Sequence, residues 1–161
     1  MSCLSAAEMV QATPFLLVLF LVLGAHGLSV KKCALTGRWV NDLGSNMTIE
    51  PVNANGDFAG SYHTAVTATT NEIKVSPLQG SMQKGPNQKG QPTFGFTVNW
   101  SFSDTTSVFT GQCFVDDDGK EILKTMWLLR SYVDKIEDDW KATWVGYNVF
   151  ERLDMHMEGG W

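Results

Sequence analysis

Aromatic and hydroxyl-bearing side chains recur close together in the second half of this 161-residue chain. Every second residue from Phe94 to Trp100 is apolar, which is the period of a strand with one buried face. Small hydroxyl residues follow directly, between Ser103 and Ser107. Tryptophan walls combined with converging hydroxyl groups suit a small, flat ligand with a polar head, held in a mostly apolar cavity.

Two later stretches supply further candidates for the same cavity. Residues 122–130 place Trp127 and Leu129 on one face if they form a strand. A second stretch contains Trp140 and ends near Asn148. Trp and Phe on strands pack in the core of most proteins, and Ser and Thr near strand ends commonly form turns. These residues therefore do not establish a ligand site by themselves.

The elements that would position these side chains are strands. Short alternating or apolar runs separated by turn signals favour an all-β fold. The predicted strands cover residues 37–41, 47–52, 57–62, 72–77, 93–100, 107–114, 122–131 and 141–152. An antiparallel array with short sequential connections closes most simply as an eight-stranded up-and-down β-barrel, because closure removes exposed edges. A barrel of this size holds side chains or one small ligand.

The two ends of the chain are predicted to lie outside this domain. Residues 14–25 form an apolar run followed by small residues, which is typical of a secretory signal and too short for a membrane span. We therefore expect a signal peptide over residues 1–29, with an uncleaved anchor as the alternative, and a folded domain over residues 30–153. Residues 154–161 carry no pattern and are expected to be a flexible tail. Residues 81–91 are rich in Gly, Gln and Lys and are expected to form a mobile hairpin loop.

The cysteines and sequons agree with secretion. Cys33 and Cys113 remain after the signal is removed, so a disulfide is the default expectation in an oxidising compartment. The tripeptide that begins at Asn46 matches the N-glycosylation pattern. A second sequon begins at Asn99. We expect Asn99 to be unglycosylated, because a strand enters the proposed cavity there.

Charge and motif content exclude several function classes. The formal net charge is −5, and no basic run is present, so neither nucleic acid nor an anionic membrane is an expected partner. The chain lacks a paired acid and base, a nucleophile elbow and a cysteine–histidine metal cluster. We therefore expect a binding protein without catalytic residues, metal or cofactor. A lipocalin-like barrel for an apolar ligand and a structural protein without a ligand remain as alternatives.

Apolar residues also fall on the outer face of the predicted barrel. Met126 and Leu128 alternate with the inward residues of one strand, and Val145 and Tyr147 do so on the next. Large exposed apolar patches are uncommon on monomers. We therefore expect a further subunit to cover them.

Long contiguous segments resemble the avidin family, whose members are secreted biotin-binding proteins with a streptavidin-like barrel. The resemblance extends from Cys33 to about Leu153 and is carried by CALTGRWVNDLGSNMTI, SYHTAVTATTNEI, QPTFGFTVNWSF, VFTGQCF, LKTMWLLRS and DDWKAT. It implies tight non-covalent binding and sequestration of biotin, and assembly as a glycosylated homotetramer.

The resemblance also implies the roles of individual residues. Donors to the ureido oxygen of biotin fall on Asn41, Ser45 and Tyr62, and acceptors for the two ureido N–H groups fall on Thr64 and Asn148. Ser107 falls near the thioether sulfur. The carboxylate is expected to meet Thr67, Ala68, Thr69, Ser103 and Thr105. The walls are Trp100, Phe109 and Trp127, with Leu43, Val66, Phe102 and Leu129 filling gaps. Trp140 matches a tryptophan that enters a neighbouring subunit's pocket.

This sequence departs from the family pattern at a few positions. Trp144 stands where a basic residue is expected, and the sequence alone gives no account of it. Tyr147 replaces a smaller aliphatic residue on the outer face. The overall acidic charge predicts weak association with nucleic acid, in contrast to strongly basic members of the family.

Overall fold

The computed structural model describes residues 31–153 and contains one closed antiparallel barrel. The expected signal peptide at residues 1–29 and the expected tail at residues 154–161 lie outside the described residues. The strands are β1 Gly37–Asn41, β2 Asn46–Ile49, β3 Asp57–His63, β4 Ser76–Met82, β5 Thr93–Asn99, β6 Thr105–Val115, β7 Glu121–Ser131 and β8 Thr143–Arg152. Two 3₁₀ helices are described as well, η1 Pro86–Gln88 and η2 Ile136–Lys141. Within residues 31–153, no helix is long and apolar enough to cross a membrane.

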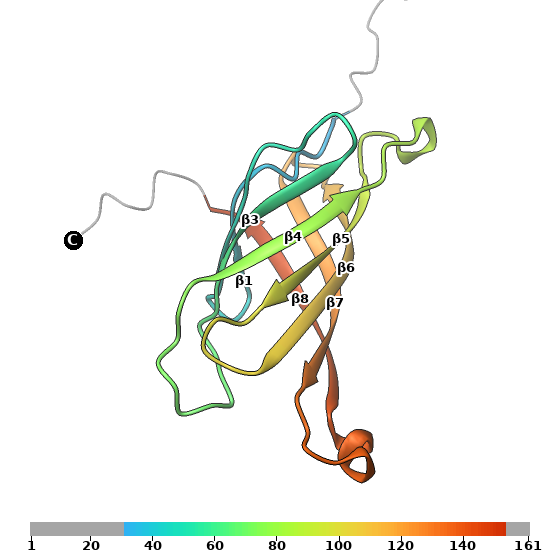
Figure 1. Ribbon diagram of the computed structural model, residues 1–161. Helices are drawn as coiled ribbons and strands as arrows, with labels where there is room; N and C mark the ends of the chain where they lie inside the picture. The colour runs from blue at the N-terminus through green and yellow to red at the C-terminus, as the bar shows by residue number, and fades with distance from the viewer. Residues whose placement is uncertain (1–30, 154–161) are drawn as a thin grey trace, which may run out of the picture. The chain divides into compact units, whose positions relative to one another are not determined.

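The strands follow one another around the barrel in sequence order (Figure 1). Each pairs antiparallel with the next, and β1 closes the ring against β8, with Trp39 opposite Arg152 and Asn41 opposite Phe150. Every backbone ladder therefore has a partner on both sides, as closure requires. The predicted eight-stranded up-and-down barrel is confirmed.

Strand alternation fills one half of the barrel with apolar side chains. On β5, Phe94, Phe96 and Val98 point inward and are buried, while their neighbours face outward. The end of the barrel that lies away from the cavity described below is plugged by Trp39, which is fully buried and donates from Nε1 to the Leu35 carbonyl at 2.8 Å. A packed core at this end makes the barrel interior a blind-ended space.

The predicted disulfide is confirmed. Cys33 is bonded to Cys113 on β6. The backbone N–H of Cys33 also donates to the Gly90 carbonyl at 2.7 Å. The segment that precedes β1 is therefore fixed across the plugged end of the barrel.

The predicted position of the fourth strand was wrong. It was expected at residues 72–77, whereas β4 is Ser76–Met82. Pro77 is the second residue of β4 rather than the last residue of a strand, although proline cannot donate to a sheet ladder. Its side chain lies on the outer face, and Leu78 is the first large buried residue of β4. The following loop consequently begins after Met82, and it contains η1.

Smaller boundary differences have local causes. Strand β2 ends at Ile49 rather than at residue 52, because Pro51 lacks an N–H group. Strand β8 begins at Thr143 rather than at residue 141, because Lys141 still belongs to η2.

Four connections meet at the open end of the barrel: residues 42–45, 64–75, 100–104 and 132–142. The β7–β8 hairpin extends beyond the other strands, and η2 lies at its tip (Figure 1). Loops placed on a closed scaffold are a common location for binding residues. This end therefore holds the candidate site.

Candidate functional site

A cavity of about 510 Å³ lies at the loop end of the barrel. Its walls come from five strands, β1, β3, β6, β7 and β8, and from the connections at this end of the barrel. The lining residues are Asn41, Leu43, Ser45, Tyr62, Thr64, Val66, Thr67, Ala68, Thr69, Trp100, Phe102, Ser103, Thr105, Ser107, Phe109, Trp127, Leu129, Ser131, Trp144 and Asn148. None of them carries a formal charge at neutral pH, so the chamber is neutral, with an aromatic wall and a set of fixed polar groups.

Three polar groups converge at the inner end of this cavity, from Asn41, Ser45 and Tyr62. The Oδ1 atom of Asn41 accepts from the backbone N–H of Leu43 at 3.0 Å and of Ser45 at 2.8 Å, which leaves Nδ2 to point at the Tyr62 hydroxyl, 3.4 Å away. The turn that permits this arrangement needs Gly44, whose φ is +83°. Asn41 is therefore both a turn residue and a cavity donor.

The Ser45 hydroxyl accepts one hydrogen bond from the backbone and also lies within hydrogen-bonding reach of Tyr62. The backbone N–H of Ala65 donates to Ser45 Oγ at 3.0 Å. The hydroxyl hydrogen can therefore point into the cavity. Ser45 is almost fully buried, where water competes poorly for such a donor.

Tyr62 remains protonated over the whole physiological pH range. Burial raises the pKa of Tyr62 to about 12, a hydrogen bond with Ser45 lowers it, and the nearby Asp42 carboxylate raises it. A phenol with this pKa is a hydrogen-bond donor at neutral pH rather than an anion. Asn41, Ser45 and Tyr62 can therefore all donate to one acceptor oxygen.

Asn148 is held by partners on both sides of its amide. Its Nδ2 donates to Asp42 Oδ1 at 3.0 Å, while its Oδ1 accepts from Trp127 Nε1 at 2.9 Å. The carboxylate thereby fixes which amide atom faces the cavity. One lone pair of Oδ1 is left for a ligand N–H group.

Thr64 offers a second acceptor. Its hydroxyl donates to the Val66 carbonyl at 2.7 Å, and the Val66 N–H donates back at 3.2 Å. Because its hydrogen is engaged, the oxygen of this buried hydroxyl can only accept from a ligand. Thr64 and Asn148 thus provide acceptors in a cavity whose inner end provides donors.

Aromatic rings form the side wall. Tyr62 packs edge-on against Trp100 with ring centroids 5.4 Å apart, and it stacks on Phe109 at 5.8 Å. Trp100 Nε1 donates to Ser107 Oγ at 2.9 Å. The Trp100 ring packs against the Phe102 ring, with the two ring centroids 5.9 Å apart. These mutual contacts hold the rings in place before any ligand arrives.

The indole of Trp127 lies directly over Gly146, its register partner on β8. A Cβ atom at Gly146 would stand 2.2 Å from the Trp127 ring. Only glycine at this position leaves space for the tryptophan to lie flat along the wall.

The mouth is bordered by two loops that are joined to each other. Asn71 Nδ2 donates to the Phe102 carbonyl at 2.8 Å, which fixes the loop containing Thr67, Ala68 and Thr69 against the β5–β6 connection. The hydroxyls of Ser103 and Thr105 are 2.6 Å apart. The mouth therefore presents hydroxyl groups rather than a cationic side chain.

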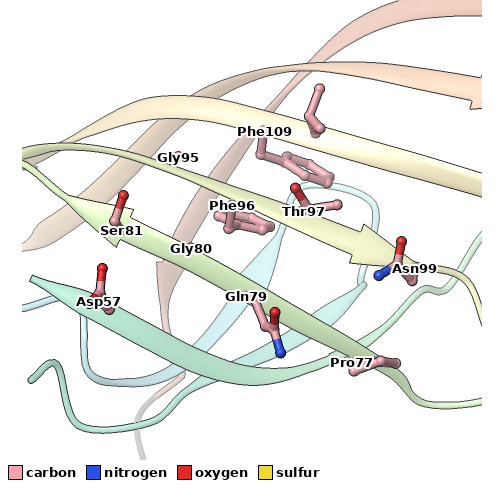
Figure 2. A pocket seen from close by; sticks show the side chains of 11 residues that line it. Asp57, Pro77, Gln79, Gly80, Ser81, Gly95, Phe96, Thr97, Asn99 and Phe109 are labelled. Atoms are coloured by element: carbon pink, nitrogen blue, oxygen red, sulfur yellow. The ribbon is translucent and has the colours of Figure 1, made fainter.

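A second hollow of about 620 Å³ lies on the outside of the barrel, over β3 to β6 (Figure 2). The side chains of Gln79, Thr97 and Asn99 rise from neighbouring strands, and Gly80 and Gly95 lie further along the same two strands. This groove lacks the aromatic wall and the converging polar groups of the inner cavity, so we take the inner cavity as the site although it is smaller.

The two sequons also lie on the outer face. Asn46 and Asn99 are both exposed. The reason given for expecting Asn99 to be bare is corrected here, because its side chain lines the outer groove rather than the cavity. Among residues 31–153, no group of three or more potential metal ligands occurs.

A family model described as the avidin family matches residues 29–153 of the chain. This chain belongs to the avidin family. It is 65% identical to avidin of Gallus gallus over 153 residues, which covers 93% of this chain and all of that protein. Avidin-related protein 4/5 of Gallus gallus is 59% identical over 138 residues, covering 86% of this chain and 90% of that protein.

Solved structures of the avidin family have the same barrel. The X-ray structure of a biotin-binding protein from chicken superposes with a TM-score of 0.73 at 58% identity, covering 77% of this chain and 99% of the other. Xenavidin superposes with a TM-score of 0.72 at 52% identity, covering 76% and 99%.

The cavity contains every predicted binding residue except Trp140. Trp140 lies in η2, is 82% exposed and does not line the cavity of its own chain. Three residues were missed: Ser131 and Trp144 line the cavity, and Asp42 orients Asn148. The alternation of side chains along a strand could have indicated both lining residues. Ser131 is two residues after Leu129 on β7, and Trp144 is four residues before Asn148 on β8, so each faces the same side as its predicted neighbour.

Proposed function

We propose that this protein binds biotin tightly and without covalent bonds, and that it acts by sequestering the vitamin rather than by catalysis. The arrangement of Asn41, Ser45 and Tyr62 carries this proposal. Three neutral donors directed at one point suit the carbonyl oxygen of a cyclic urea, whose polarity increases when it accepts several hydrogen bonds.

The rest of the cavity matches the rest of the ligand. The two ureido N–H groups find acceptors in Thr64 and Asn148. The fused rings lie between Trp100, Phe109 and Trp127, with Leu43, Val66, Phe102 and Leu129 filling the remaining space. Ser107 lies near the thioether sulfur. The carboxylate meets Ser103, Thr105 and the segment Thr67, Ala68 and Thr69.

Affinity in this account comes from preorganisation. The donors, acceptors and rings are already held by contacts within the protein. Little side-chain entropy is therefore lost when the ligand binds. Biotin bound to streptavidin is a known example of near-limiting non-covalent affinity. An apolar carrier is a poorer account, since it has no use for a buried cluster of donors.

We further propose that the protein is a secreted, glycosylated homotetramer in which Trp140 completes the pocket of a neighbour. The intrachain disulfide agrees with an oxidising compartment, and Asn46 is exposed for glycosylation. Apolar side chains on the outer face of β7 and β8, among them Met126, Leu128 and Val145, are exposed in the single chain. Exposure of this kind supports burial against another copy.

Native mass spectrometry of the secreted protein, with and without biotin, tests this proposal. We expect a tetramer that gains one biotin mass per chain. Binding of a fatty acid in place of biotin would support the carrier alternative and contradict the proposal.

A further inference from the structure

Trp144 is the one large aromatic residue of the cavity lining to which the proposed binding mode assigns no contact with biotin. It lies on β8 opposite Leu129 of β7. Trp144, Gly146 and Asn148 are every second residue of β8 and therefore face the same side of the sheet, which is the cavity side. Val145 and Tyr147 face outward. Its ring continues the apolar wall from Trp127 and Leu129 towards solvent.

The exposure of Trp144 shows where along the cavity it acts. Asn148 is buried, whereas Trp144 is 64% exposed although it lines the cavity. Ser131 flanks it from β7 and is only half-buried. The indole therefore stands at the mouth, beyond the part of the cavity that is enclosed.

The mouth beside Trp144 is electrically neutral. No lining residue is charged. Arg130, the cation between Leu129 and Ser131 on β7, has its side chain on the outer face and is engaged by Asp139 and by the Thr143 hydroxyl. A ligand whose carboxylate has been converted to an amide therefore loses no ion pair here, and its new substituent leaves the cavity alongside the indole.

We propose that Trp144 is a specificity-determining residue that favours ligands conjugated through their carboxyl group to a planar aromatic substituent. The inference rests on the proposed function, because the conjugates in question are amides of biotin. A flat ring can stack on the indole face, whereas a puckered saturated ring of similar size cannot.

Dissociation rates of biotin, biotin anilide and biotin cyclohexylamide test this assignment. We expect the wild-type protein to release the anilide about three- to tenfold more slowly than the cyclohexylamide, the range that one aromatic contact supplies. Trp144→Ala should abolish that ratio. Trp144→Phe should retain most of the ratio.

Tyr132→Ala serves as the matched control, because Tyr132 is an exposed aromatic residue close to the mouth that does not line the cavity. It should behave as wild type. Equal ratios in the wild-type and Trp144→Ala proteins would overturn the inference and leave the proposed function intact. Failure of the wild-type protein to bind free biotin would instead overturn the proposed function and this inference with it.

Discussion

Tyr62 is the residue whose chemistry is most sharply defined. It is 3% exposed, and burial together with the Asp42 carboxylate keeps its phenol neutral, against the smaller opposing effect of Ser45. The neutral phenol is the form that can donate to a ligand oxygen. Ligand binding and protein stability should therefore respond to alkaline pH through this group.

We predict that biotin affinity is nearly flat from pH 7 to about 10 and falls as the pH approaches the Tyr62 pKa of about 12. The pKa is raised above its ordinary value of 10.0, so between these values the folded protein retains a proton that the unfolded chain loses. The stability contribution is thus complete below pH 10 and is lost as the pH rises towards 12. Tyr62→Phe should remove this dependence and weaken binding by about 1–3 kcal/mol. An unchanged alkaline profile of melting and affinity in Tyr62→Phe would contradict the assignment.

A second prediction concerns Asp42, whose carboxylate accepts a hydrogen bond from Asn148. Asp42→Ala removes the acceptor that fixes the amide, so Asn148 can rotate and present the wrong group. We expect a loss of about 1.5–3 kcal/mol in biotin affinity, the usual range for a hydrogen bond to a charged group. Asp104→Ala makes the same change of charge on the β5–β6 connection. If the two variants bound equally well, Asp42 would have no positioning role.

At the scale of the elements, the wall of the cavity depends on how β7 and β8 pack. Trp127 and Gly146 face each other in the ladder, and the indole occupies the space where a side chain would stand. The position of this wall is therefore a property of the strand pair rather than of the tryptophan alone.

Gly146→Ala should displace Trp127, because the new methyl group would lie 2.2 Å from the ring. We expect weaker biotin binding and a shift in tryptophan fluorescence, with the barrel still folded. Gly85→Ala is the control, since its Cβ would meet only Gln88 Cγ at 3.9 Å and its φ is −105°. Wild-type affinity in Gly146→Ala would show that the wall tolerates the displacement.

Sequence alone could predict most of these elements because their alternation is strong. The Phe94–Trp100 run fixes both the strand and its buried face. Strand β4 was misplaced, and the register of Leu78 against Val98 in the folded sheet locates it. Individual site residues followed from family resemblance, whereas the Asp42–Asn148 contact joins residues 106 positions apart and has no local signal.

At the scale of the whole molecule, the main prediction concerns assembly. Trp140 is exposed at the tip of the β7–β8 hairpin, and in our proposal it covers a neighbour's ligand. Trp140→Lys should accelerate biotin release markedly while leaving the fold of each barrel intact, as measured by chase experiments and circular dichroism.

Ile136→Lys provides the control for this change. Ile136 lies in the same 3₁₀ helix and is 85% exposed, so the two variants differ in position and not in introduced charge. Release rates that are unchanged by Trp140→Lys, or that are changed equally by both variants, would contradict the shared-pocket proposal.

The central claim is that a barrel of this sequence contains a preformed socket for a cyclic urea. Calorimetric titration of the secreted protein with biotin tests it most directly. We predict strong heat release that saturates at one biotin per chain, with no comparable heat from decanoic acid. Absence of heat with biotin at stoichiometric concentration, together with an unchanged melting temperature, would contradict the claim.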